Sequence, residues 1–174
     1  MSSILIRQGG ANASLDVFGP TIEFLTSPEQ GDGSYCVMMG TVPRGIAVPL
    51  HSHPDLESFF LISGGLEVLS ERGGRLEWQD VKCSEFVHIP SNAKHAWRNT
   101  SSAPSVMLIT ITPKLGRFFQ EIGRPVTVGA FPGPPTPDEL QHFARITAKY
   151  GYWIATPEEN SDVGIDLSRL GLRP

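Results

Sequence analysis

The sequence has few cysteines, few charges and no long apolar run. Only two of its 174 residues are cysteines, Cys36 and Cys83, and their separation matches no zinc-binding spacing. Nothing about them indicates an oxidising compartment, so we expect two free thiols buried in strands of a cytoplasmic protein. No apolar run approaches the ~18 residues of a membrane span, and the N-terminus lacks the pattern of a signal peptide. We therefore expect no membrane partner.

The charge balance excludes a second group of partners. The formal net charge at pH 7 is −4 and 18% of the residues are charged, below the usual ~25%. The basic field that would hold a polyanion is missing, so we expect no nucleic-acid partner.

What the sequence has in excess is glycine and proline. The 18 glycines and 15 prolines make up nearly a fifth of the chain, against a background nearer ~12%, which excludes a long helical rod. Up to Pro113 they separate short β-type runs such as Thr21–Leu25, Tyr35–Val42 and Val106–Ile111. The last two are apolar at nearly every position, which predicts strands covered on both faces. We expect an all-β barrel or sandwich with one face against a partner subunit or an extra segment.

Two local patterns refine this region. Gly73-Gly74 between residues 66–70 and 75–78 predicts a hairpin, and Ile4–Ile6 predicts a strand near the N-terminus. We assign residues 1–113 to a barrel domain.

The pattern changes after Pro113. Residues 114–122 predict a short helix, and a stiff proline-rich linker occupies residues 131–137. A strong helix start at the end of this linker predicts a second helix from Pro137 to Tyr150. The polar tail from Pro157 is expected to be partly mobile. We predict that residues 114–174 form a helical extension packed on the barrel.

The main clue to chemistry is the placement of three of the five histidines. His51 and His53 are alternate residues, so on a strand their imidazoles share a face, as two ligands of one metal must. Glu57 has the same parity four residues on, although a Pro-Asp pair interrupts the run. His95 starts another expected strand, which a barrel brings beside the first pair.

Three imidazoles and one carboxylate are a ligand set for a divalent transition metal. Imidazole suits iron, copper, nickel and zinc, and the carboxylate adds manganese, so these five metals stay open. Four protein ligands on a five- or six-coordinate metal leave a position for substrate or dioxygen. A structural zinc site would be closed and would more often contain cysteine.

The spacing of these residues resembles the two sequence motifs of the cupin superfamily. The first motif, Gly45-(x)5-His51-x-His53-(x)3-Glu57-(x)6-Gly64, is matched at every fixed position. The second reads Ser84-(x)5-Pro90-Ser91-Asn92-(x)2-His95-(x)3-Asn99, with Ser84 and Asn92 where the family has glycine. Asparagine tolerates positive φ better than most residues, and no ligand is lost. The chain is thus similar to single-domain cupins of the Cupin_2 type.

The resemblance implies a double-stranded β-helix, or jelly-roll barrel, with one metal in its mouth. It also implies that His51, His53, Glu57 and His95 are the metal ligands. All four ligands are present, which argues against a cupin that has lost its metal. Without a metal, this group of buried polar and charged side chains would destabilise the fold.

The layout further resembles the small bacterial quercetinase-type dioxygenases. That resemblance implies a planar aromatic or enolisable substrate that coordinates the metal through a hydroxyl or enolate oxygen. Glu57 would then be both a metal ligand and the catalytic general base. Phe59, Trp97 and Met107 would form the apolar wall of the substrate pocket.

Two other functions fit the same ligands. A non-redox cupin, such as an isomerase, lyase or polyketide cyclase, would use the metal as a Lewis acid. A small-molecule binding protein would recognise a ligand without converting it. Regulatory cupins usually carry a fused DNA-binding helix-turn-helix, and the sequence shows no such segment.

We also expect a homodimer. Small cupins commonly pair their barrels edge to edge through N-terminal strands. Residues Ser3–Leu25 contain enough β-branched and apolar side chains to do so.

Overall fold

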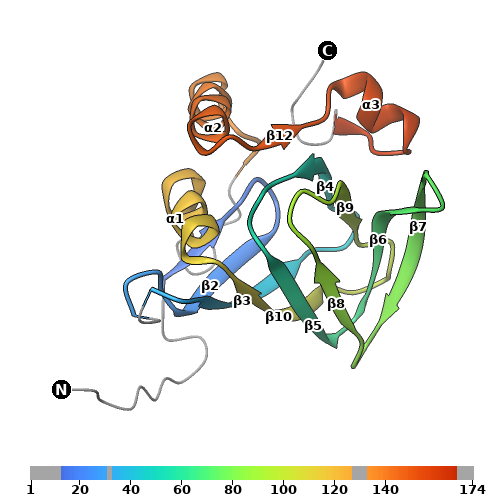
Figure 1. Ribbon diagram of the computed structural model, residues 1–174, viewed down its shortest axis with the longest axis horizontal. Helices are drawn as coiled ribbons and strands as arrows, with labels where there is room; N and C mark the ends of the chain where they lie inside the picture. The colour runs from blue at the N-terminus through green and yellow to red at the C-terminus, as the bar shows by residue number, and fades with distance from the viewer. Residues whose placement is uncertain (1–12, 31–32, 127–132, 168–174) are drawn as a thin grey trace.

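The fold is a barrel of two antiparallel β-sheets with helices packed at one end (Figure 1). The computed structural model describes residues 13–30, 33–126 and 133–167. Within them the larger sheet has the strand order β11 (Arg124–Val126), β1 (Ser14–Asp16), β2 (Thr21–Thr26), β3 (Cys36–Val42), β10 (Ser105–Ile111), β5 (Glu57–Ser63), β8 (Phe86–Ile89). The smaller sheet has the order β12 (Trp153–Ile154), β4 (Ala47–Ser52), β9 (His95–Arg98), β6 (Gly65–Arg72), β7 (Arg75–Lys82). This confirms the predicted all-β jelly-roll class.

Three helices follow the first ten strands. They are α1 (Pro113–Ile122), α2 (Pro137–Tyr150) and α3 (Pro157–Asp162). The first two were expected from the sequence, and each begins at a threonine whose side chain accepts a hydrogen bond from the first helical turn. None of the described helices is long and apolar enough to cross a membrane. The predicted strand at Ile4–Ile6 lies outside the described residues.

The chain beyond Ile111 adds one edge strand to each sheet. Strand β11 pairs with β1, and β12 pairs with β4. Within the tail that was expected to be partly mobile, α3 forms a regular helix that begins with a complete capping box between Thr156 and Glu159. The division of the chain at residue 113 stays a prediction.

Two apolar clusters hold the layers together. The main cluster fills the barrel and continues under α1 and α2 through Leu115, Phe118 and Ile146. A smaller cluster lies on the other face of the five-stranded sheet, where Ile165 and other residues of the C-terminal segment contact residues of β4, β6 and β9. Asn160 in α3 fixes this segment, because its fully buried amide donates to two backbone carbonyls and accepts the N–H of Leu50 in β4. Both faces of the smaller sheet are therefore covered.

The outer face of the larger sheet is only partly covered within this chain. Burial alternates along β3 and β10 between buried and half-buried residues, and the expected cover of this face by a partner subunit stays a prediction. Met39, Leu108, Phe60 and Phe86 form a row across four adjacent strands, and Phe86 is 64% exposed. These apolar residues point outward, which is why the sequence pattern resembled that of a fully buried strand.

The pairing of β1 and β2 in the larger sheet is relevant to the expected edge-to-edge dimer. Strand β1 lies between β11 and β2, and β2 lies between β1 and β3. Both edges of each strand are therefore already paired within the chain, so neither is free for edge-to-edge contact. The homodimer stays a prediction.

The two cysteines are free, but only one is buried. Cys36 lies in β3 and is completely covered, and burial raises the pKa of its thiol to about 11. Cys83 is exposed in the turn after β7, so the expectation of two buried thiols is wrong for this residue.

The glycine positions of the two motifs require a left-handed backbone. Gly45 and Gly64 have φ of 76° and 81°, and Ser84 and Asn92, which replace glycine in the second motif, have φ of 70° and 64°. Non-glycine residues rarely adopt this conformation. The substitutions thus keep the backbone geometry that the glycines would supply.

We expect Gly64→Ala to destabilise the barrel more than Gly74→Ala. The two glycines have nearly the same φ, 81° and 80°, so the conformational penalty of a side chain is matched. A Cβ at Gly64 would lie 2.8 Å from the carbonyl oxygen of Pro104, whereas a Cβ at Gly74 meets nothing within 4 Å. Overpacking of this kind adds about 1–3 kcal/mol. Denaturant unfolding of both variants measures the difference, and equal losses would show that the contact at Gly64 relaxes.

Candidate metal centre and its cavity

Three histidines from separate positions of the chain meet inside one end of the barrel. His51 in β4 pairs directly with His95 in β9, and His53 lies just beyond the end of β4. The ring centroids of His51 and His95 are 4.1 Å apart, and those of His53 and His95 are 5.1 Å apart. One ligand atom from each histidine can be chosen so that all three lie within 4.8 Å of one another. The structure thus brings together the three imidazoles that the sequence singled out.

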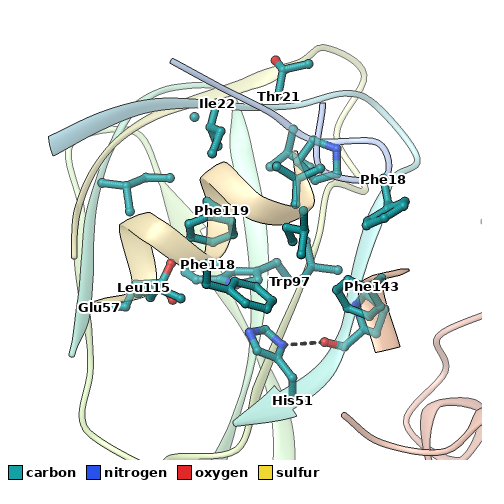
Figure 2. Close-up of a pocket in the computed structure, with 18 of the residues that line it drawn as sticks. Phe18, Thr21, Ile22, His51, Glu57, Trp97, Leu115, Phe118, Phe119 and Phe143 are labelled. Atoms are coloured by element: carbon teal, nitrogen blue, oxygen red, sulfur yellow. Dashed lines mark hydrogen bonds between the residues drawn. The ribbon is translucent and has the colours of Figure 1, made fainter. Parts of the chain in front are cut away.

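A backbone carbonyl orients each ring. The Nδ1 atoms of His51, His53 and His95 lie 2.7, 2.8 and 2.9 Å from the carbonyl oxygens of Pro49, Asp55 and Ala93. Figure 2 shows the first of these hydrogen bonds. A neutral ring that donates through Nδ1–H keeps its lone pair on Nε2, which is the atom that remains for a metal.

The remaining nitrogens have no protein partner. The Nε2 atoms of His53 and His95 are buried without a hydrogen bond. Buried polar atoms in folded proteins nearly always have a hydrogen-bond partner. Two neighbouring nitrogens without one therefore require an explanation. A divalent transition metal bound by these lone pairs would satisfy both.

Glu57 completes the ligand set from the opposite sheet. It begins β5, is 7% exposed, and places Oε2 3.4 Å from Nε2 of His53 and 3.6 Å from Nε2 of His95. Burial alone would raise the pKa of Glu57, but the two histidine rings beside its carboxylate outweigh burial and hold the pKa well below its usual range. The carboxylate is therefore ionised, as a metal ligand must be.

The histidines differ in their electrostatics. Burial and the neighbouring imidazoles lower the pKa of His51 to about 3, so its ring is neutral. Burial would also lower the pKa of His53, but Glu57 and the carbonyl of Asp55 outweigh this effect and raise it. An imidazole that binds a metal through Nε2 is neutral, so three such rings and one carboxylate fit a borderline divalent metal, with the negative charge supplied by Glu57. The residues present therefore fit the metal that the sequence suggested.

A cavity of about 180 Å³ opens onto this group. Figure 2 shows His51 and Glu57 at one end and the rings of Trp97, Phe118 and Phe119 along the wall. Beyond His51, His53 and Glu57, the polar side chains that line it are those of Thr21, Thr41 and Tyr152, together with the indole of Trp97, and no lysine or arginine does so among the described residues. The cavity wall is therefore mainly apolar, and among the described residues its only carboxylate is that of Glu57.

Two of the three residues expected in the pocket wall line the cavity. Trp97 and Met107 do so. Phe59 is completely buried and is not part of the lining, because its ring packs against Trp97 with a centroid separation of 3.8 Å. It supports the wall from within the core.

Sequence reasoning missed much of the wall that the helices supply. The apolar faces of α1 and α2 contribute six lining residues, namely Leu115, Phe118, Phe119, Ile122, Leu140 and Phe143. The sequence showed an apolar set in the first helix, but that pattern alone cannot distinguish packing on the core from lining a cavity. The helical extension therefore closes the cavity as well as covering the barrel.

Phe18 at the mouth of the cavity is held in an unusual conformation. Its φ is 56°, in the left-handed region that non-glycine residues avoid. The carboxylate of Asp16 accepts the N–H groups of Phe18 and Gly19, and Arg124 of β11 pairs with the same carboxylate. The turn places the Phe18 ring 5.2 Å from that of Phe143 in α2. Strain stored in a cavity-lining residue is typical of a site shaped for a ligand.

Comparison with known proteins agrees with this geometry. Residues 37–111 match the Cupin_2 family model, described as a cupin domain, and this range contains all four candidate ligands. None of the curated proteins compared is similar in sequence to the chain at a significant level.

Solved structures with the same architecture are distant in sequence. The polyketide cyclase RemF from Streptomyces resistomycificus is 16% identical, with a TM-score of 0.55 over 64% of this chain and 80% of its own. A predicted oxalate decarboxylase from Thermotoga maritima is 17% identical, with a TM-score of 0.54 over 63% of this chain and 98% of its own. An RmlC-like cupin from Shewanella frigidimarina is 13% identical, with a TM-score of 0.52 over 64% and 92%. At these identities the likeness establishes the fold alone.

Proposed function

Because the chain contains a cupin domain, we propose that it is a metal-dependent dioxygenase for a small, uncharged aromatic or enolisable substrate. The observation that carries this proposal is that the unpartnered Nε2 atoms of His53 and His95 lie beside Glu57, and that His53 and Glu57 line a mainly apolar cavity. A reactive centre in an apolar pocket that excludes water is the arrangement that enzymes use to protect reactive species.

The dimensions and polarity of the cavity limit the substrate. A cavity of about 180 Å³ is somewhat larger than the ~150 Å³ cavity that holds benzene. It suits one ring, or an enolisable chain of similar size. No lysine or arginine lines the described wall, so a carboxylate or sulfonate that does not itself coordinate the metal would find no counter-charge, and burying an unpaired charge is strongly unfavourable.

Each residue of the site has a separate role in the proposed reaction. A bound divalent metal would lower the pKa of a coordinating hydroxyl or enol and would supply the Lewis-acid and redox chemistry. His51, His53 and His95 would hold it through Nε2, each fixed by its Nδ1 hydrogen bond. The ionised carboxylate of Glu57 would accept the hydroxyl proton at an oxygen. Trp97 and Phe118 would orient a planar substrate and exclude water.

A non-redox reaction is the second candidate. The observation that favours it is the ionised carboxylate of Glu57 in the cavity wall, since a base beside a Lewis acid suffices for isomerisation, elimination or cyclisation. Both candidates need the same substrate class, and they differ in their need for dioxygen.

Turnover with and without dioxygen separates the candidates. We expect the protein loaded with iron, manganese, nickel or copper to consume dioxygen with catechol or acetylacetone, two small uncharged probes of the substrate class. Oxalate, which is equally small but charged, should not react. Product formation under anaerobic conditions would instead identify the non-redox reaction. Recovery of every probe unchanged, with binding detected by quenching of the tryptophan fluorescence, would contradict an enzyme and favour a binding protein.

A further inference from the structure

Asp55 has an environment that the metal-binding motif does not require. It lies between the candidate ligands His53 and Glu57 and is 6% exposed, while the next residue, Leu56, is 44% exposed. A carboxylate turned inward beside a leucine turned outward reverses the usual preference of these residue types. Such an inversion indicates that the protein uses the buried carboxylate.

Two hydroxyl groups from distant parts of the chain bind this carboxylate. The phenol of Tyr152 donates to Oδ2 at 2.5 Å, and the hydroxyl of Thr112 donates to Oδ1 at 2.5 Å. Lys114 is a weaker partner, with Nζ 3.9 Å from Oδ2 and a half-exposed side chain. Thr112 caps α1 and Tyr152 follows α2. These two helices supply apolar residues to the cavity wall, and we call them with their flanking residues the helical cap. Both principal partners of Asp55 therefore belong to the helical cap.

The backbone of Asp55 connects this network to the candidate metal centre. The carbonyl oxygen of Asp55 lies 2.8 Å from Nδ1 of His53 and orients that ring. The side chain and carbonyl belong to one residue, so fixing the carboxylate restricts the direction of the carbonyl. The ring of Tyr152 also lies against His53, with a centroid separation of 5.5 Å, and lines the cavity.

We propose that Tyr152 is a positioning residue for the metal centre, which acts through Asp55 on His53 and makes metal affinity depend on the helical cap. This inference rests on the metal centre proposed above. Groups that orient a ligating histidine from behind typically contribute 10–100-fold to metal affinity. Tyr152 would do so from a position 97 residues along the chain from Asp55.

A pair of tyrosine variants tests the proposal. Tyr150→Phe is the matched control, because the Tyr150 phenol also donates to a carboxylate, that of Glu121 at 2.7 Å, and its ring lies 5.6 Å from that of Tyr152. Each variant loses one such hydrogen bond, but only Tyr152 contacts Asp55. We expect Tyr152→Phe to weaken Zn²⁺ binding by about 10–100-fold in competition with a chromophoric chelator, and to shift the visible absorption bands of bound Co²⁺. Tyr150→Phe should leave both unchanged.

The outcomes are distinguishable from failure of the proposed function. If the wild-type chain binds no Zn²⁺ or Co²⁺, the metal centre itself is wrong. If the wild type binds and both variants match it in affinity and Co²⁺ spectrum, only the role of Tyr152 is overturned. Should Tyr152→Phe not fold, Thr112→Val compared with Thr136→Val gives the same test. Both remove a helix N-cap, but only Thr112 binds Asp55. Equal affinities in that pair would overturn the proposal.

Discussion

Replacing His95 with alanine is expected to abolish stoichiometric metal binding. His95 is 1% exposed, and its Nε2 lies without a hydrogen-bond partner 3.6 Å from Glu57. Loss of one of three imidazoles removes a direct ligand, so the affinity should fall by more than the ~100-fold upper range seen for groups that only orient a ligand. Elemental analysis after dialysis of protein purified without chelator measures the loss.

His88→Ala is the control for this substitution. His88 is exposed in β8 and shares a hydrogen bond with Ser58, the residue after Glu57. Alternate residues of a strand point to opposite faces, so the His88 side chain lies on the outer face of the sheet with Phe86, away from the interior that holds the candidate ligands. We expect His88→Ala to retain the metal content of the wild type. Equal metal content in the wild type and in both variants would show that His95 is not a ligand.

Replacing Arg124 with alanine is expected to destabilise the fold by about 3–5 kcal/mol. The guanidinium binds the carboxylate of Asp16 through Nε at 2.9 Å and through a second nitrogen at 2.5 Å. Asp16 is 3% exposed, so the substitution leaves a buried negative charge whose remaining partners are backbone N–H groups. The loss is large because the unpaired charge has been removed from water.

Lys149→Ala provides the comparison for an exposed ion pair. Lys149 contacts Glu121 at 2.8 Å, but their side chains are 55% and 33% exposed. Exposed pairs of this kind contribute little to stability, because water and salt screen them. Denaturant unfolding of both variants measures the contrast. Similar losses would mean that water reaches Asp16 after the substitution and that the Arg124 pair behaves as a surface contact.

The consequences of the Arg124 substitution extend to the cavity. The carboxylate of Asp16 holds the turn in which Phe18 adopts its left-handed backbone, and the guanidinium also lies over the Phe18 ring. Arg124 thus connects an edge strand supplied by the C-terminal part of the chain to a residue at the cavity mouth. The same ion pair therefore contacts both an edge strand of the sheet and the turn that carries a cavity-lining side chain.

The features that could be predicted from the sequence are those encoded by local spacing. The short β-type runs between turn signals predicted an all-β fold, and the spacing of His51, His53, Glu57 and His95 carried the resemblance to cupins that implied the jelly-roll barrel and the convergence of the three histidines. Ser84 and Asn92 were recognised as replacements for glycine, and both adopt the positive φ that this requires.

The features that were missed depend on contacts between distant segments. No local pattern connects Tyr152 to Asp55 or Arg124 to Asp16, because each pair forms only when the C-terminal segment packs on the finished barrel. Phe59 was misplaced for a related reason, since strand parity assigns a side chain to the barrel interior but not to the cavity surface. Parity fixes which face a residue occupies, and packing decides what it touches there.

The most direct test of the metal centre is X-ray absorption spectroscopy at the zinc edge of the full chain loaded with Zn²⁺. The proposed centre predicts scattering from three imidazole rings and an oxygen ligand, with no sulfur, because both cysteines lie outside the ligand group. A first shell that contains sulfur, or fewer than three imidazoles, would contradict the assignment of His51, His53, Glu57 and His95.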